Sequence, residues 1–291
     1  DARALVTNTP AGLTGFAGWS PDGSKAAAIG FKTLDAFDGR TLVIRPATGG
    51  AETRIDLDGP VAPSPSPRWA SIGNQLLVGV GTGPGGPPGT VDIQTGRVTK
   101  VSIPPKFTAG VFSPDGRRYF IVPRQHDVAT ILMYDTVSRT EKEILLDRDS
   151  WLIRGLSPSP DGKRLAYSVT MAIMQNGKKV PSYESGLRVL DVESGAVTEV
   201  AVVRTSWWGA RFSTAWTPDA QNLIFAREEE DTDKSGLFIV SSAGGEPKPI
   251  SELQEGRIFD LAVNPDGKML GYTRFKETAN LWLIQNVLPK H

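Results

Sequence analysis

The chain of 291 residues contains no cysteine and only two histidines, His126 and His291. Without cysteine there is no disulfide bond, no thiolate nucleophile and no cysteine-ligated zinc, and two histidines cannot build a three-histidine metal site. The Gly-x-Ser-x-Gly motif, which surrounds the nucleophile of many hydrolases, is also missing. These absences argue against acyl transfer and zinc hydrolysis. We therefore expect a protein that is not an enzyme.

An excess of charge of one sign and long apolar runs are missing as well. Lysine and arginine together number 32, and aspartate and glutamate together also number 32. Proteins that bind nucleic acid or anionic membranes normally carry a basic excess or a basic stripe, so neither partner is expected. No apolar run approaches the roughly 20 residues of a transmembrane helix. We expect no insertion into a membrane.

What the sequence does contain is a repeated Pro-Asp turn. The turn occurs as WSPDG at 19–23, FSPDG at 112–116, PSPDG at 158–162, WTPDA at 216–220 and VNPDG at 263–267, with a weaker copy, WASIGNQ, at 69–75. When Asp22, Ile72, Asp115, Asp161, Asp219 and Asp266 are taken as equivalent, the spacings are 50, 43, 46, 58 and 47 residues. Propeller blades repeat every 40–50 residues or so. The turn aspartates are expected to bond nearby backbone amides.

Each copy continues with an apolar strand, a third strand and a more polar fourth strand, and no segment shows a helical period. We predict an all-β fold, a six-bladed β-propeller of four-stranded antiparallel blades in a single domain over 1–291. The predicted blades span approximately 11–58, 59–103, 104–146, 147–202, 203–251 and 252–288. The last copy lacks its fourth strand, and segment 3–9 resembles that strand. The N-terminal strand is therefore expected to close the last blade.

The Ser-Pro-Asp-Gly turns resemble the repeats of the TolB-like propeller family, also called PD40 or WD40-like repeats. The resemblance covers essentially the whole chain, with the second copy degenerate. It implies a bacterial propeller that binds proteins, typically in the periplasm. The α/β domain that precedes the propeller in TolB has no counterpart here, and neither does the hydrolase domain of prolyl oligopeptidases, whose propeller is also similar. The chain starts at Asp1 without methionine or a signal segment, so we expect that it was processed or cut from a larger protein. The resemblance implies a periplasmic or other extracytoplasmic place.

Strand parity separates two ends of the predicted ring. The Pro-Asp turns lie at one end, and the links between blades lie at the other, together with the long segment at 170–186 of blade four. The links carry tryptophans and arginines, which are enriched at binding hot spots. The predicted binding residues are Trp151, Arg154, Arg204, Trp207, Trp208, Arg211 and Arg257.

We expect this Trp/Arg rim to bind a protein or peptide and the chain to be a monomer. A small-ligand or carbohydrate sensor, possibly one domain of a larger signalling or exported protein, is the alternative, because aromatic platforms beside arginines also suit sugars and carboxylates. A third possibility is a lyase or hydrolase that uses carboxylates and arginines. Its one candidate acid in the channel is Asp260, near the start of the last inner strand.

Two further motifs resemble ligand sites only in part. Oxygen-bearing side chains alternate at Asp231, Asp233 and Ser235, as in the first half of a calcium loop, but the glutamate expected at the twelfth position is missing. The glycines at 81–86 precede Pro87-Pro88, so no helix can begin there to hold a pyrophosphate. We expect no cofactor, with calcium at the first motif as the alternative.

Overall fold

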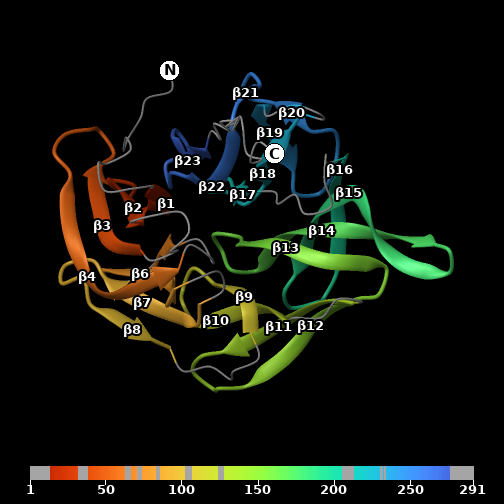
Figure 1. Cartoon of the computed structure of the whole chain (residues 1–291), viewed down its shortest axis with the longest axis horizontal. Coiled ribbons are helices and arrows are strands. Elements are labelled where there is room, and N and C mark those ends of the chain that lie inside the picture. Colours follow the sequence, from red (N-terminus) through yellow and green to blue (C-terminus); the bar gives the residue numbers. More distant parts are fainter. Residues whose placement is uncertain are drawn as a thin grey trace, which may run out of the picture.

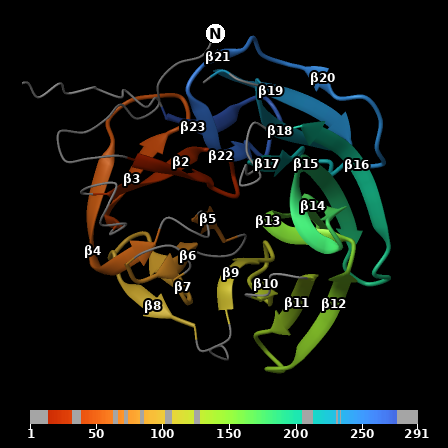
Figure 2. The same cartoon turned by 45° about the vertical axis from the view of Figure 1, so that its right-hand side comes forward.

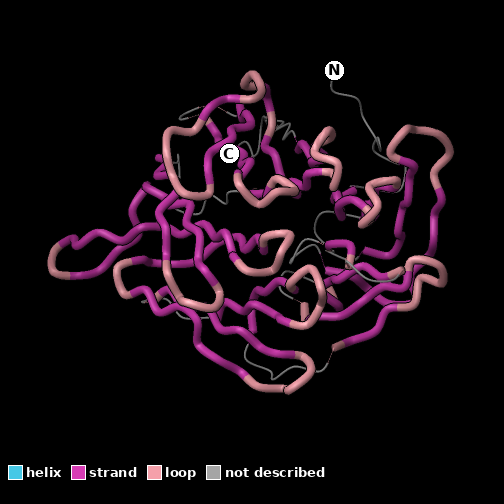
Figure 3. The backbone as a smooth tube through the Cα atoms, turned by 180° about the vertical axis from the view of Figure 1, so that it is seen from behind, coloured by secondary structure: helices cyan, strands magenta, loops and turns pink. Residues whose placement is uncertain are grey.

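The computed structural model describes residues 14–31, 39–62, 67–70, 74–82, 86–101, 107–123, 128–204, 213–229, 232 and 234–275. These residues form 23 strands, and Figure 3 shows strands and loops with no helix among them. The described part of the chain thus has no helix that is long and apolar enough to cross a membrane. The strands are arranged as a ring of sheets around a central channel (Figures 1 and 2).

Blades one and two share a continuous sheet. Blade one contains β1 (Thr14–Trp19), β2 (Lys25–Phe31), β3 (Gly39–Pro46) and β4 (Thr53–Ala62). Blade two contains β5 (Arg68–Trp69), β6 (Gln75–Val80), β7 (Pro88–Asp92) and β8 (Val98–Lys100). The end of β4 pairs with β6, where Val61 lies opposite Val80. Because of this pairing the two blades are hydrogen-bonded to each other at their edges.

Blades three and four are complete four-stranded sheets. Blade three contains β9 (Phe107–Phe112), β10 (Arg118–Pro123), β11 (Ala129–Asp135) and β12 (Glu141–Asp147). Blade four contains β13 (Ser150–Pro158), β14 (Arg164–Gln175), β15 (Lys178–Asp191) and β16 (Val197–Arg204). The hairpin of β14 and β15 projects from the ring (Figure 1).

Blades five and six complete the ring. Blade five contains β17 (Thr214–Trp216), β18 (Asn222–Glu228), β19 (Lys234–Ser241), β20 (Lys248–Pro249) and the short β21 (Gln254–Glu255). The described strands of blade six are β22 (Arg257–Val263) and β23 (Leu270–Phe275). The all-β propeller predicted from the repeats is confirmed. The predicted closing strand 3–9 and the rest of blade six lie outside the described residues.

The core lies between neighbouring blades. Phe120 and Ile131 of blade three pack with Leu165 and Val169 of blade four, and all four side chains are fully buried. Successive residues of a strand point to opposite faces of its sheet. Apolar side chains at every second position of a strand therefore all point to the same neighbouring blade. Each such side chain stabilises the fold by about 1.5–3 kcal/mol. Stacked sheets of this kind hold the inner strands in fixed positions around the channel.

The turn aspartates have the structural role that was predicted. In blade three the Ser113 hydroxyl donates to Asp115 at 2.5 Å, and the same carboxylate accepts the Arg117 amide at 3.1 Å. The same two bonds recur at Asp22, Asp161 and Asp219. The Ser113 oxygen also accepts the Arg118 amide, which begins the next strand. Each turn therefore satisfies its own backbone donors.

Blade six lies beside blade one, although the two are at opposite ends of the described chain. Trp19 Nε1 donates to the Ala262 carbonyl at 3.0 Å, and Asn264 Nδ2 donates to the Gly23 carbonyl at 2.9 Å. An equivalent bond joins blades five and four, where Trp216 Nε1 donates to the carbonyl of Ser157 at 2.7 Å. Because the first bond repeats the geometry of an internal contact, the inner strands form a closed ring.

Candidate binding site in the central channel

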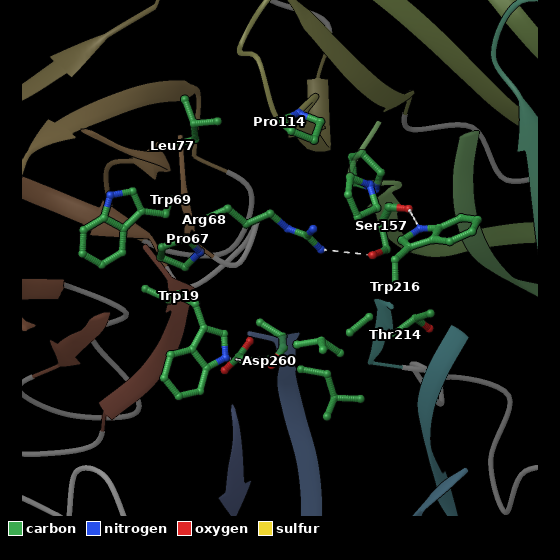
Figure 4. Close-up of a pocket in the computed structure, with 18 of the residues that line it drawn as sticks. Trp19, Pro67, Arg68, Trp69, Leu77, Pro114, Ser157, Thr214, Trp216 and Asp260 are labelled. Carbon is green, nitrogen blue, oxygen red and sulfur yellow. Dashed lines mark hydrogen bonds between the residues drawn. The ribbon is translucent and has the colours of Figure 1, made fainter. Parts of the chain in front are cut away.

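The inner strands surround a cavity of about 280 Å³. Its lining comes from all six blades, and Figure 4 shows the side chains that point into it. The lining includes Pro114, Pro160 and Pro265, which belong to Pro-Asp turns. The cavity therefore reaches the surface at the turn end of the ring. This is the end opposite to the predicted Trp/Arg rim.

One layer of the channel is built from structurally equivalent residues. The penultimate residue of each inner strand pairs with a residue near the beginning of the second strand of the same blade, as Gly18 pairs with Ala27. The six equivalent positions are Gly18, Arg68, Val111, Ser157, Ala215 and Ala262. Five of them line the cavity, whereas Val111 packs in the core between blades three and four. Most of them are small, and only Arg68 has a long polar side chain. The small neighbours leave the space that this side chain enters.

Arg68 reaches across the cavity from β5 towards β13 (Figure 4). Its Nη2 lies 3.4 Å from the Ser157 hydroxyl, which is a long hydrogen bond. Burial lowers the pKa of Arg68 to about 10, and the negative charge of Asp260 acts in the opposite direction. The guanidinium is therefore still protonated at neutral pH. The cavity holds a permanent positive charge.

Asp260 is the carboxylate among the described residues that line the cavity. It has a φ of 54° and lies in an irregular stretch of β22, where the register shifts between Phe259 and Ala262. Positive φ is uncommon for residues other than glycine, although aspartate adopts it more readily than most, and a bulge re-aims the side chain of its strand. The structure thus brings the predicted channel acid and Arg68 into one cavity. Sequence reasoning identified Asp260 but missed Arg68.

A signal for Arg68 was present in the repeats. The strand before each Pro-Asp turn is short and rich in small residues, as in Phe16-Ala17-Gly18-Trp19. In the degenerate second copy the position equivalent to Gly18 is an arginine. A charged residue in a layer of small residues next to a channel is the pattern that identifies it.

The structure describes the side chains of two residues of the predicted Trp/Arg rim. Trp151 is half-buried near the beginning of β13, and Arg257 begins β22, with its Nε 3.7 Å from a carboxylate oxygen of Glu228. Neither residue lines the cavity. The side chains of the remaining rim residues lie outside the described part of the chain: Arg154, Arg204, Trp207, Trp208 and Arg211. The rim stays a prediction.

The partial calcium motif is only partly described. Asp231 and Asp233 lie outside the described residues, whereas Ser235 lies fully buried on β19. Its hydroxyl donates to the Gly256 carbonyl at 2.5 Å, which ties β19 to the segment before blade six. Within the described ranges no group of three or more histidine, aspartate or glutamate side chains could hold a metal ion.

Solved structures share this ring of strands, whereas no protein-family model and no curated protein sequence matches the chain. TolB from Acinetobacter baumannii is 20% identical with a TM-score of 0.57, over 84% of this chain and 56% of that chain. A putative TolB from Agrobacterium tumefaciens is 14% identical with a TM-score of 0.64, over 92% of each chain. The chain has the TolB-like propeller fold.

The chain spans 56% of the length of the Acinetobacter protein, so it matches that protein in part. An oligogalacturonate lyase in complex with manganese is also similar, at 14% identity and a TM-score of 0.53, over 87% of this chain and 68% of that chain. The TolB-like propeller fold therefore occurs in proteins with different activities. At these identities the likeness concerns the fold, and function has to be argued from the site.

Proposed function

We propose that this TolB-like propeller is a non-catalytic scaffold that binds an extended segment of a protein partner at the mouth of its central channel. The observation that carries the proposal is the cavity at the turn end, which residues of six blades surround. Its volume of about 280 Å³ is at the small end of the range for ligand sites. A folded domain does not fit such a space, whereas one or two side chains of a partner do.

The chemistry of the lining supports a peptide-like occupant. Trp69, Leu77, Pro67 and the turn prolines offer apolar surface, and Arg68 adds a charged group at the centre. Apolar walls with a few polar groups are typical of sites that orient a ligand by one or two specific contacts. Rigid inner strands hold these groups in place, so little ordering is needed on binding.

A small-ligand or carbohydrate sensor is the second candidate, and the small volume of the cavity favours it. For catalysis by a pair of carboxylates, a second acid would have to join Asp260. Asp260 is the one carboxylate among the described residues of the lining. We further infer a place outside the cytoplasm, and the TolB-like fold supports that inference.

Photo-cross-linking in cells of the source organism tests the proposal. A photoreactive phenylalanine analogue replaces Pro160 at the cavity mouth, Trp151 near the opposite end of the channel, or Val137 on an exposed turn of blade three. We expect one partner to be cross-linked from position 160 and not from position 137, and peptide mapping to place the link in an extended segment. Cross-links from position 151 alone would instead support the Trp/Arg rim.

A further inference from the structure

Among the described residues, Arg68 has few partners for a half-buried arginine. A guanidinium has five N–H donors, and the side-chain bond of Arg68 is the long one to Ser157 Oγ at 3.4 Å. Among the described residues, no carboxylate forms an ion pair with it. Asp260 acts on it through space. In the described part of the chain, the other donors of this cavity-lining guanidinium bond no further residue.

Other half-buried arginines of the same chain show what a structural role requires. Arg164 donates to the Ser242 hydroxyl at 2.9 Å and to the Ala220 carbonyl, and its guanidinium lies 5.0 Å from the centre of the Trp216 ring. Arg188 pairs with Asp147 and also donates to the Ser150 hydroxyl at 3.0 Å. Each of these arginines joins neighbouring strands or blades. Arg68 makes no comparable set of bonds with the residues that the structure describes.

We propose that Arg68 is an anion anchor and that its ligand is a carboxylate, supplied by the C-terminus or an acidic side chain of a bound protein segment. The planar guanidinium matches a carboxylate through two parallel hydrogen bonds. The neighbouring charge of Asp260 disfavours a doubly charged anion such as phosphate. The protein source of the carboxylate rests on the proposed function, whereas the anchor itself does not.

The test compares probes that differ in a single group. N-acetyl-trialanine with a free carboxylate, the same peptide with a C-terminal amide, and propionate are each titrated to about 50 mM. Tryptophan indole and arginine Nε–H signals are followed by NMR. The protein forms are the wild type, R68Q, R68K and R117Q, in which the altered arginine is exposed on the turn of blade three.

We expect both carboxylates to shift the Arg68 signal and indole signals of the cavity, and the amide to shift none. R68Q should weaken binding at least tenfold, R68K should weaken it less, and R117Q should bind as the wild type does. If propionate binds and the peptide with a free carboxylate does not, the result would support the anchor and contradict a peptide occupant. If the peptide acid and the peptide amide bind equally well, and R68Q does not change their binding, the anchor is overturned. The proposed binding of a protein segment would not be contradicted by that result.

Thermal unfolding separates an anchor from a structural arginine. Arg68 is half-buried and has few partners among the described residues, so its removal should not destabilise the ring. R68Q should therefore unfold at the same temperature as the wild type or higher. A midpoint lower by several degrees would assign Arg68 a structural role and overturn the proposal. Absence of any shift with all three probes would overturn it as well.

Discussion

At the scale of single residues, the Pro-Asp turn is stabilised by a serine or threonine that donates to the aspartate two positions later. The Ser20 hydroxyl and the amide and hydroxyl of Ser24 lower the pKa of Asp22 to about 2. Asp219 has a lowered pKa for the same reason, with Thr217 as the main donor. Hydrogen bonds to the ionised form favour that form. These carboxylates therefore contribute to stability while they are charged.

Acidification should remove that contribution. A group with a lowered folded pKa stabilises the protein above its unfolded pKa of about 4 and loses this effect as the pH falls towards the folded value. We expect the double variant D22N/D219N to lose less stability than the wild type between pH 5 and pH 2, as measured by urea unfolding. S20A should act in the same direction, because it removes the main donor to Asp22. Parallel curves for all three proteins would contradict this assignment.

At the scale of elements, the hairpin of β14 and β15 is the largest departure from a regular blade. Asn176 and Gly177 connect its strands, with φ values of 53° and 74°. Two successive positive φ values are typical of a type I′ turn, which suits the twist of a hairpin. The Lys179 ammonium donates to the carbonyls of Arg148 and Ser150 and thereby ties the hairpin to the base of its blade. The long segment predicted at 170–186 is therefore mostly paired strand.

A substitution at the tip of this hairpin should loosen it locally. A Cβ at Gly177 would meet no atom within 4 Å, so the cost of G177A comes from its positive φ and amounts to about 1 kcal/mol. We expect the amides of Lys179 and Val180 to exchange several times faster, as measured by hydrogen exchange, with the midpoint of global unfolding little changed. G30A is the control, because Gly30 has an ordinary φ and a Cβ there would make only ordinary contacts. Equal effects of the two variants would contradict the role of φ.

At the scale of the whole molecule, the ring is closed by contacts between its first and last blades. The bond from Trp19 to Ala262 spans 243 positions of sequence and has an internal counterpart in the bond from Trp216 to Ser157. In a closed ring each blade packs against two neighbours, so no blade can unfold without breaking two interfaces. The loss of one contact therefore lowers the stability of the whole ring. The channel and its cavity exist only while this ring is closed.

Loss of either tryptophan bond should therefore lower the stability of the whole ring. W19F and W216F each remove one N–H donor and keep an aromatic ring. We expect each to cost about 1–3 kcal/mol, because the partly buried Ala262 carbonyl or the buried Ser157 carbonyl loses this donor. Unfolding should remain a single transition when it is followed by tryptophan fluorescence and by circular dichroism. A W19F protein with wild-type stability would contradict closure through this bond.

The sequence by itself determined the number of blades, the strand class and the chemistry of the turns. Ser113, Asp115 and the glycine after them act within a few residues of one another, so local sequence is sufficient to predict them. It also singled out Asp260 as a residue of the channel. The tertiary structure decided which residues meet across the channel. Arg68 belongs to the weakest copy of the repeat, and its environment depends on Ser157, 89 positions away. Contacts of that kind arise from ring closure, because the inner strands face one another only when all six blades are assembled.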